Sequence, residues 1–500
     1  MPDVPLLVLT APSRGVDGAR DDISRARESG ADVVELRIDR WPESERGRVG
    51  ELFPAPLPLM ATLRSRTEGG EGPDDPEARR ATLLAVARSP FRWMDLEEAR
   101  DLPIAHEFPS DPAPLLVASA HLPGDTSPAA LVDRLRRPLP PRTIRKIVLP
   151  ANLGRLLGEI LPTLRAAGTS GAVVLTTGPS GPLLRAWAPE LGYPLVYAAP
   201  RVVPGPSLSE KVEASQVPVD RLRWYFEGPV RSLYAILGRP VAHSQSPYLH
   251  ARWMRAHGHH GLYVPLEVAS ETEFVEALEP LAARGLYGAN VTHPWKMVAL
   301  ASATRVARGA EVCGAANCLT FHDGEIEAEN TDLAAALRRL EELRDSGRWT
   351  SNELVVLGSG GSAAATLAAA RELRAEAYVM ARSAEKAAAL SARFESRRLP
   401  AEEIRPFSLV VHATDVGRAD ADRLELPLSK LVNSDTVVLD WVYAAADDVV
   451  RRTVLGAGGT YEDGWRLLVY QAAASFGIWW GDAPDAEEID RTIREGPCAA

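Results

Sequence analysis

The chain has 500 residues, of which 46% are hydrophobic and 25% charged, and its formal net charge is −11. A chain of this length divides into about three domains of roughly 150 residues, or fewer if one is a barrel, and it buries enough apolar surface to fold without disulfides or metals. An acidic chain without a basic block is a poor candidate for nucleic-acid binding, because phosphate contacts need clustered cations. The three cysteines, at 313, 318 and 498, lack the paired spacing of a zinc site and fit a reducing cytosol.

No segment of the sequence predicts membrane insertion or export. The apolar run near the N-terminus has no basic residues before it, so it predicts a strand and not a signal peptide. The charge-free stretch Leu467–Gly481 is too short to span a bilayer and contains Gln471. We therefore expect a cytoplasmic protein with small-molecule partners, and the sequence leaves its oligomeric state open.

The first 200 residues carry eight short apolar runs separated by helical or loop stretches. Eight such β signals with α signals between them predict a (β/α)8 barrel, and an open doubly wound sheet is the alternative. A stretch rich in Pro and Ser then precedes DRLRWYF, and together they predict the tail of the barrel and a linker. The predicted strands are Leu6–Ala11, Val33–Ile38, Leu59–Arg64, Arg92–Glu97, Leu115–His121, Ile144–Leu149, Ala172–Thr177 and Leu195–Ala199.

Polar residues lie where these strands face the barrel axis or end. In DVVELRID, alternation puts Glu35, Arg37 and Asp39 on the inner face, which is costly unless the charges are paired or used. This fold builds its active sites at the carboxyl ends of its strands. The inner charges therefore predict either a layer of ion pairs or an active site, to which later strands add Arg64, Asp95, Glu97 and His121.

Lys146 lies in TIRKIVLPA on the sixth predicted strand, and it is one of only five lysines in the chain. A buried amine close to arginines loses its proton more easily, and a neutral amine can attack a ketone to form an imine. An ion pair with Glu35 or Glu97 is the alternative interpretation, and the residues alone do not decide between the two.

Over about residues 4–225 the chain resembles type I 3-dehydroquinate dehydratase. The matching motifs are ELRID at 35–39, TLRSRTEGG at 62–70, ASAH at 118–121, RKIVLPA at 145–151 and TGPSGPLLR at 177–185. The resemblance implies that Lys146 forms a Schiff base with the substrate ketone and that His121 is the general base. It also implies a substrate-binding set of Glu35, Arg37, Arg64, Glu68, Arg185 and Gln216.

The loop that closes the site in this family departs from the family pattern. Gln216 matches the family's glutamine, but Val212 stands where a serine is expected. An alternative alignment puts Pro206 in place of the glutamine.

In the second half, the predicted strand Glu353–Leu357 leads through GSGGSA at 358–363 into the predicted helix Ala363–Leu373. This strand, turn and helix are typical of a dinucleotide site, where glycines let the backbone approach the pyrophosphate. An acidic residue after the next strand would favour NAD, whereas this chain has Arg382 followed by Ser383. The arginine predicts NADP, although it is also compatible with an ordinary surface position.

Three polar clusters lie upstream of this motif: HSQSP at 243–247, NVTHPWK at 290–296 and ENTD at 329–332, with GAAN at 314–317 between the last two. Ser244 and Ser246 can donate to a carboxylate, and Lys296 with Asp332 can form a pair that moves a proton at a carbinol oxygen. Taken singly, each cluster is equally compatible with a turn or a helix cap.

Together, these clusters resemble shikimate dehydrogenase over about residues 231–495. Further matches are ATDVG at 413–417, VLDWVYA at 438–444 and EDGWRLLVYQAAASFGIWWG at 462–481, with Ala381 and Asp415 as departures from the usual Asn and Pro. The resemblance implies Lys296 and Asp332 as the catalytic pair. It implies a substrate set of Ser244, Ser246, Asn290, Thr292, Asn317, Tyr443 and Gln471 and a cofactor set of Gly358, Ser359, Gly360, Gly361, Ser362, Ala363, Arg382, Ser383, Thr414 and Gly464.

The sequence therefore predicts an α/β protein with a barrel at 1–225, a substrate-binding lobe at 231–340 with a returning helix at 466–495, and a Rossmann-type NADP lobe at 350–462. The two halves would catalyse consecutive steps of the shikimate pathway. Alternatives are a catabolic quinate/shikimate dehydrogenase fusion and a regulator without catalysis. The four expected catalytic side chains argue against the regulator.

Overall fold

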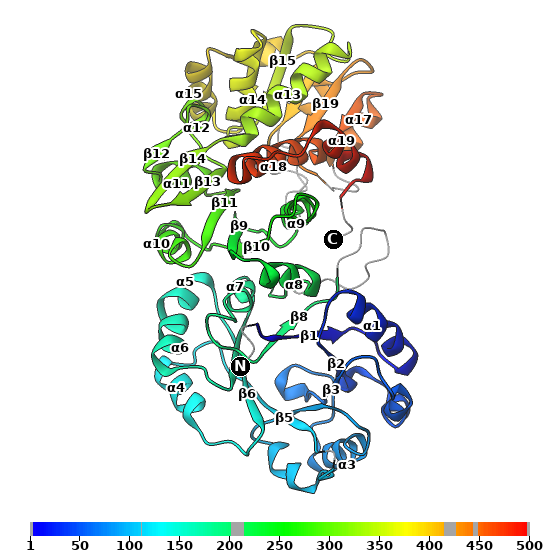
Figure 1. Ribbon diagram of the computed structural model, residues 1–500. Coiled ribbons are helices and arrows are strands. Elements are labelled where there is room, and N and C mark those ends of the chain that lie inside the picture. The colour runs from blue at the N-terminus through cyan, green and yellow to red at the C-terminus, as the bar shows by residue number, and fades with distance from the viewer. Residues whose placement is uncertain (1–3, 112, 202–214, 415–426, 444–448, 498–500) are drawn as a thin grey trace.

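The computed structural model describes residues 4–111, 113–201, 215–414, 427–443 and 449–497. Its first half is a nearly closed barrel of eight parallel strands in the order β7-β6-β5-β4-β3-β2-β1-β8 (Figure 1). The structure confirms the barrel and not the open sheet, and β3 ends two residues before the predicted end at Arg64. The strands are β1 Leu6–Ala11, β2 Val33–Arg37, β3 Leu59–Thr62, β4 Trp93–Glu97, β5 Leu115–His121, β6 Thr143–Pro150, β7 Ala172–Thr177 and β8 Leu195–Ala198.

Helices enclose the outside of the barrel and cover its apolar strand faces. In the first of them, Val16, Ala19, Ile23 and Ala26 are buried at helical spacing, which gives one apolar stripe towards the strands. The helices are α1 Val16–Glu28, α2 Glu43–Arg46, α3 Pro76–Val86, α4 Pro128–Arg136, α5 Leu153–Arg155, α6 Leu161–Ala167 and α7 Gly181–Ala186.

The second half contains two six-stranded sheets. The first has the order β10-β9-β11-β13-β14-β12 and is mixed, because β13 runs antiparallel to both of its neighbours. Its strands are β9 Ser232–Gly238, β10 Gly261–Glu267, β11 Leu286–Val291, β12 Arg305–Val306, β13 Cys318–His322 and β14 Glu325–Glu329. Its helices are α9 Ser246–Ala256, α10 Glu271–Ala282, α11 Lys296–Ala301, α12 Arg308–Cys313 and α13 Thr331–Asp345.

The second of these sheets is parallel, with the order β17-β16-β15-β18-β19-β20. Parallel strands joined by helices are typical of nucleotide-binding lobes. The strands are β15 Glu353–Leu357, β16 Glu376–Met380, β17 Arg397–Arg398, β18 Leu409–His412, β19 Val437–Asp440 and β20 Thr460–Glu462. The helices are α14 Gly361–Glu372, α15 Ala384–Phe394, α16 Leu428–Leu431 and α17 Val449–Gly456.

The expected single returning helix at 466–495 is wrong, because this segment forms two helices, α18 Trp465–Trp480 and α19 Ala486–Glu495. Gly481 ends α18 in the left-handed conformation, at φ 67°. Asp485 then begins α19 with a capping box, in which Asp485 and Glu488 each accept from the other's backbone N–H. Helix α18 packs against both α9 and α13, and α19 packs against α18 (Figure 1).

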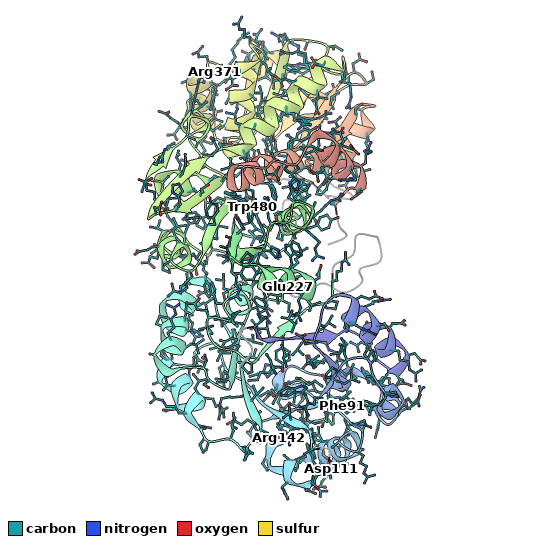
Figure 2. The ribbon with its side chains drawn as sticks, viewed as in Figure 1. Phe91, Asp111, Arg142, Glu227, Arg371 and Trp480 are labelled. Carbon is teal, nitrogen blue, oxygen red and sulfur yellow. The ribbon has the colours of Figure 1, made fainter. Side chains whose placement is uncertain are left out.

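A helix joins the two halves where the sequence predicts a linker. This helix, α8 Val219–Glu227, packs against both β1 and β10, and Figure 2 shows Glu227 at the junction. Across the same junction, the backbone N–H of Gly154 donates to the Glu273 carboxylate at 2.7 Å. One hydrophobic core continues from the barrel into the first mixed sheet. Within the described residues, no helix is both long and apolar enough to cross a bilayer.

Candidate active sites

Lys146 lies inside the barrel and is almost completely buried. Its Nζ donates to Asp95 Oδ2 at 2.9 Å and lies 3.8 Å from Glu35 Oε1. The same nitrogen stands 3.7 Å from the centre of the Tyr197 ring. The structure therefore brings the amine to the barrel axis, as the strand alternation predicts, and gives it Asp95 as its partner.

Asp95, on β4, holds two cations at once. Its Oδ1 accepts from Arg64 at 2.9 Å and its Oδ2 accepts from Lys146, and the Ser119 hydroxyl donates to it as well. Burial opposes ionisation of this carboxyl, but the charges of Lys146 and Arg64 hold its pKa well below the usual range. A buried carboxylate shared by two cations fixes the position of both.

His121 stands at the end of β5 and forms a 2.9 Å hydrogen bond through Nδ1 with Glu68. Glu68 also accepts from Arg64 at 2.9 Å. Desolvation lowers the pKa of His121, and the positive charges of Arg64 and Lys146 act in the same direction, while Glu68 opposes them. A neutral imidazole is therefore favoured, which is the form a general base requires.

Glu35 and Arg37 have separate surroundings despite their shared strand face. The Glu35 carboxylate accepts hydrogen bonds from the Thr10 and Thr62 hydroxyls, both at 2.7 Å. Arg37 forms a two-pronged ion pair with Asp39 at 2.8 Å for each bond. Asp39 itself lies in a 3-10 turn after β2, so the predicted row of three inward strand residues ends at Arg37.

Arg185 and Gln216 are the remaining members of the expected substrate-binding set. Arg185 is buried on α7 and donates to the carbonyl oxygens of Tyr197 and Gly181, both at 2.9 Å. The first of these bonds ties it to the strand whose Tyr197 ring faces Lys146. Gln216 is half-buried near the end of the barrel. Val212 and Pro206 lie outside the described residues.

A second site lies between the two sheets of the C-terminal half, where a cavity of about 100 Å³ opens. Both expected catalytic residues and all seven expected substrate residues line it, together with Ser362 and Gly464 of the expected cofactor set. Residues from 244 to 471, far apart in the sequence, thus converge on one cavity. Clusters that were only turns or helix caps would not need to lie together. The nine are Ser244, Ser246, Asn290, Thr292, Lys296, Asn317, Asp332, Tyr443 and Gln471.

Lys296 and Asp332 both line this cavity and are in direct hydrogen-bond contact. Lys296 begins α11, and Asp332 lies in the first turn of α13. Asn317 donates to the other carboxylate oxygen of Asp332 at 2.8 Å and to Thr331 Oγ1 at 3.0 Å. The Asn317 amide also accepts from the Thr331 backbone N–H at 2.7 Å, so Asn317 locks the start of α13.

The remaining polar residues form a connected wall. Asn290 accepts from Tyr263 and donates to Ser475, both at 2.8 Å. Tyr443 accepts a hydrogen bond from the Gln245 backbone N–H at 3.3 Å, next to the serine pair. These bonds fix the side chains before any substrate binds, which is the preorganisation that a polar substrate site needs.

The glycine-rich turn after β15 approaches this cavity closely. Gly358 has φ 130°, and a Cβ there would lie 2.3 Å from the carbonyl oxygen of Ala413. A Cβ on Gly361 would lie 3.0 Å from Cδ of Lys296. The N-terminus of α14, capped by Gly360 without a side-chain hydrogen bond, therefore meets the lysine. Its free N–H groups suit a pyrophosphate, so these residues fit a dinucleotide.

The other expected cofactor residues surround the same turn. Arg382 is exposed just after β16, and Ser383 caps α15 by accepting from the Lys386 N–H at 3.2 Å. Thr414 forms a 2.6 Å hydrogen bond with His412, which in turn bonds to Asp440 at 2.9 Å. Gly464 caps α18 where a Cβ would lie 2.5 Å from the Trp441 carbonyl oxygen. Asp415 lies outside the described residues.

Sequence reasoning missed several residues that the structure brings into these sites. Asp95 is predicted to lie among the strand-end charges but is given no catalytic or substrate-binding role, and Tyr197 beneath Lys146 gives no polar signal at all. The buried His412–Asp440 pair behind Thr414 is also missed. Strand alternation points to Asp95, whereas the other contacts depend on the packing of distant strands.

Comparison with known proteins identifies both halves. The family model described as "Type I 3-dehydroquinase" matches residues 8–223, and that of the "Shikimate dehydrogenase substrate binding domain" matches residues 236–319. The shikimate dehydrogenase (NADP(+)) of Acidiphilium cryptum is 35% identical over 261 residues, which are 51% of this chain and 93% of the relative. That of Xanthomonas campestris is 38% identical over 273 residues, or 53% and 95% respectively.

Solved structures are similar as well. Shikimate dehydrogenase from Aquifex aeolicus covers 53% of this chain and 99% of its own at 28% identity, with a TM-score of 0.49. A structure described as dehydroquinate dehydratase and shikimate dehydrogenase from S. pombe covers 98% of both chains at 20% identity, with a TM-score of 0.43. On the two family matches and the identities to the Acidiphilium and Xanthomonas enzymes, the chain belongs to the shikimate dehydrogenase family and carries a type I 3-dehydroquinase domain ahead of the dehydrogenase.

Proposed function

We propose that this chain is a bifunctional shikimate-pathway enzyme. The barrel dehydrates 3-dehydroquinate to 3-dehydroshikimate, and the second half reduces that ketone to shikimate. The observation that carries the proposal is a pair of separate sites, each with a lysine held by a carboxylate: Lys146 with Asp95 in the barrel and Lys296 with Asp332 in the cavity. Each half has the amine that its reaction needs.

In the barrel, the amine of Lys146 adds to the substrate ketone, and loss of one water gives the imine. The protonated imine keeps the single positive charge of the ammonium ion, so the carboxylates of Asp95 and Glu35 face a similar charge before and after it forms. This charge draws electrons from the neighbouring carbon and makes its proton more acidic. Hydrolysis of the imine later restores the free lysine.

His121 is the general base for that proton. Its lowered pKa keeps it neutral, and its bond to Glu68 orients the ring. The hydroxyl then leaves as water, with the proton returned through the same imidazole. We assign the binding of hydroxyls and the carboxylate to Glu35, Arg37, Arg64, Glu68, Arg185 and Gln216, because an arginine fork matches the two oxygens of a carboxylate.

The second half uses NADP, whose nicotinamide supplies the hydride for reduction when it is bound. The cofactor set given above would hold it: the turn at 358–363 for the pyrophosphate, Arg382 and Ser383 for the 2′-phosphate, and Thr414 and Gly464 nearer the cavity. Lys296 gives a proton to the oxygen of the reduced carbonyl. Asp332 holds the lysine in place and shares that proton with it.

The substrate lies in the same cavity, between the serine pair and the lysine. Ser244 and Ser246 donate to its carboxylate, while Asn290, Thr292, Asn317, Tyr443 and Gln471 contact its hydroxyl groups. We assign the barrel to residues 1–225, the substrate lobe to 231–340 with the segment 466–495, and the NADP lobe to 350–462. Fusing the two enzymes keeps the product of the first near the second, which raises its effective concentration there.

Borohydride trapping tests the first activity. The full chain is incubated with 3-dehydroquinate and sodium borohydride, and its peptides are analysed by mass spectrometry. We expect one reduced adduct on Lys146 and none in Lys146→Ala. No adduct, or an adduct on another lysine, would remove the imine mechanism. For the second activity, NADPH oxidation with 3-dehydroshikimate should vanish in the double variant Lys296→Ala/Asp332→Ala, and persistence would overturn that assignment.

A further inference from the structure

Two histidines and two carboxylates gather on the surface where α9 ends beside the turn between α18 and α19. They are His257, His259, Asp482 and Glu488. We propose that this cluster binds one transition-metal ion of the Zn²⁺ class, with the first three residues as ligands. None of the four lines the dehydrogenase cavity.

The three ligand atoms already converge. Nδ1 of His257 lies 2.7 Å from Oδ2 of Asp482, and Nε2 of His259 lies 3.9 Å from the same oxygen. All three ligand atoms fall within 4.8 Å of one another. Bonds of about 2 Å in a tetrahedral array put ligand atoms roughly 3.3 Å apart. Side-chain shifts on the order of an ångström therefore suffice to hold an ion between them.

His259 has a ring nitrogen without a partner. Its Nε2 is buried and makes no hydrogen bond within the part of the chain that the structure describes. The distance to Asp482 is too long for a hydrogen bond. Meanwhile the ring is fixed by stacking on Trp480, with 4.2 Å between ring centres and 11° between planes. A buried polar atom left unpaired costs free energy, and a metal ion would satisfy it.

Glu488 supplies the outer contact that a metal-bound histidine usually has. Nε2 of His257 forms a 3.0 Å hydrogen bond with this carboxylate, which leaves Nδ1 to face the ion. A carboxylate on the far nitrogen fixes the tautomer and the orientation of a ligating imidazole. Glu488 is itself held by the capping box of α19. The arrangement is therefore a ligand set with its support already in place.

The ion would act as a structural clasp. Asp482 belongs to the turn between α18 and α19, whereas His257 caps α9, so a shared ion ties three helices together. At the other end of α19, Glu495 pairs with Arg252 of α9. Because α9 carries Ser246 and α18 carries Gln471, the clasp braces two walls of the cavity from outside it. Asp482 is 58% exposed, so water can complete the coordination.

The test uses the full chain, prepared without a polyhistidine tag and stripped of metals. Zn²⁺ is added in a calorimetric titration, and the melting temperature is measured in parallel. We expect one ion per chain and a rise in Tm of roughly 5 °C at saturation. Ca²⁺ should give no such shift, because it prefers oxygen ligands to imidazole.

His259→Phe keeps the stacking on Trp480 but removes the ligand nitrogen, and Asp482→Ala removes the carboxylate. Both should abolish the stoichiometric site. His322→Ala is the matched control, because His322 also lies 3.9 Å from a carboxylate, that of Asp323, but at the exposed end of β13. Zn²⁺ binding that is absent from the wild-type chain, or unchanged in His259→Phe, would overturn the proposal. In the wild-type chain, Co²⁺ should give a tetrahedral absorption spectrum, and an octahedral spectrum would count against the ligand set.

Discussion

The side-chain amide of Asn317 donates a 2.8 Å hydrogen bond to Oδ1 of Asp332, while Lys296 contacts Oδ2. The carboxylate is therefore held on both oxygens, and its orientation towards the lysine depends on Asn317. From the sequence, Asn317 is expected to contact the substrate. Its amide group forms hydrogen bonds with Thr331 and Asp332 at the start of α13, so Asn317 also positions the catalytic pair.

Replacing Asn317 with alanine should lower kcat of the dehydrogenase more than it raises KM. A hydrogen bond to a charged group contributes about 1.5–3 kcal/mol, so we expect kcat to fall roughly 10–100-fold. Steady-state kinetics with shikimate and NADP+ measures the split. Asn352→Ala, at an exposed site, is the control. A rise in KM with unchanged kcat would show that Asn317 acts only as a substrate contact.

The dehydratase should stay active at a lower pH than it would if its general base had the ordinary histidine pKa. Desolvation, with Arg64 and Lys146, lowers the pKa of His121 below 6.5, so the acidic limb of kcat/KM should lie below that pH. Glu68 opposes this effect and raises the pKa. In Glu68→Gln, the limb should therefore move further towards acid. A limb that moves towards neutral pH would contradict the role assigned to this pair.

Asp95→Asn should destabilise the barrel strongly. The substitution leaves the buried Lys146 and Arg64 without their shared carboxylate, and breaking such a pair costs about 3–5 kcal/mol in the free energy of unfolding. Because the folded-state pKa of Asp95 is lowered, its stabilisation is present above about pH 3.8 and is lost as the pH falls through the lowered pKa. Urea unfolding measures the difference between the wild type and the variant, which should shrink in acid.

Glu71→Gln is the control for that experiment, since Glu71 pairs with Arg14 on the surface. An exposed pair contributes about 0–1 kcal/mol. Equal losses in the two variants would show that Asp95 does not hold the cations.

Arg382→Ala should reduce the preference for NADP over NAD. Loss of one charged contact to the 2′-phosphate should lower kcat/KM for NADPH roughly 10–100-fold and leave that for NADH nearly unchanged. Arg371→Ala is the control, because Arg371 lies on the outside of this lobe, at the end of the molecule far from the barrel (Figure 2). Equal losses for both cofactors would mean that Arg382 acts on the fold and not on the phosphate.

The barrel could be predicted from the sequence because eight short apolar runs are separated by helical or loop stretches. Glu35 and Lys146 both face the axis, as their positions among apolar neighbours require. The division of the returning segment into two helices could not be predicted, because the long apolar run before Gly481 gives no sign that the helix ends there. The left-handed glycine and the Asp485 cap divide it into two helices.

The carboxylate that pairs with Lys146 could not be predicted from the sequence. The sequence offers Glu35 or Glu97 as the carboxylate for Lys146, and the strand register aligns Lys146 with Ser119 and Ser119 with Glu97. The lysine instead reaches Asp95, two residues earlier, while Glu97 accepts from Ser65. Alternation fixes the face of a strand but not the direction of a four-carbon side chain. The same limit applies to His257 and Asp482, which are distant in the sequence.

Two independent lysine sites are assigned to consecutive steps, and a crossed assay of the full chain separates them. NADPH oxidation is followed with either 3-dehydroquinate or 3-dehydroshikimate as the starting substrate. Lys146→Ala should abolish oxidation from the first but not from the second. Lys296→Ala/Asp332→Ala should abolish both while 3-dehydroquinate is still consumed. Undiminished oxidation from 3-dehydroquinate in Lys146→Ala would contradict the account.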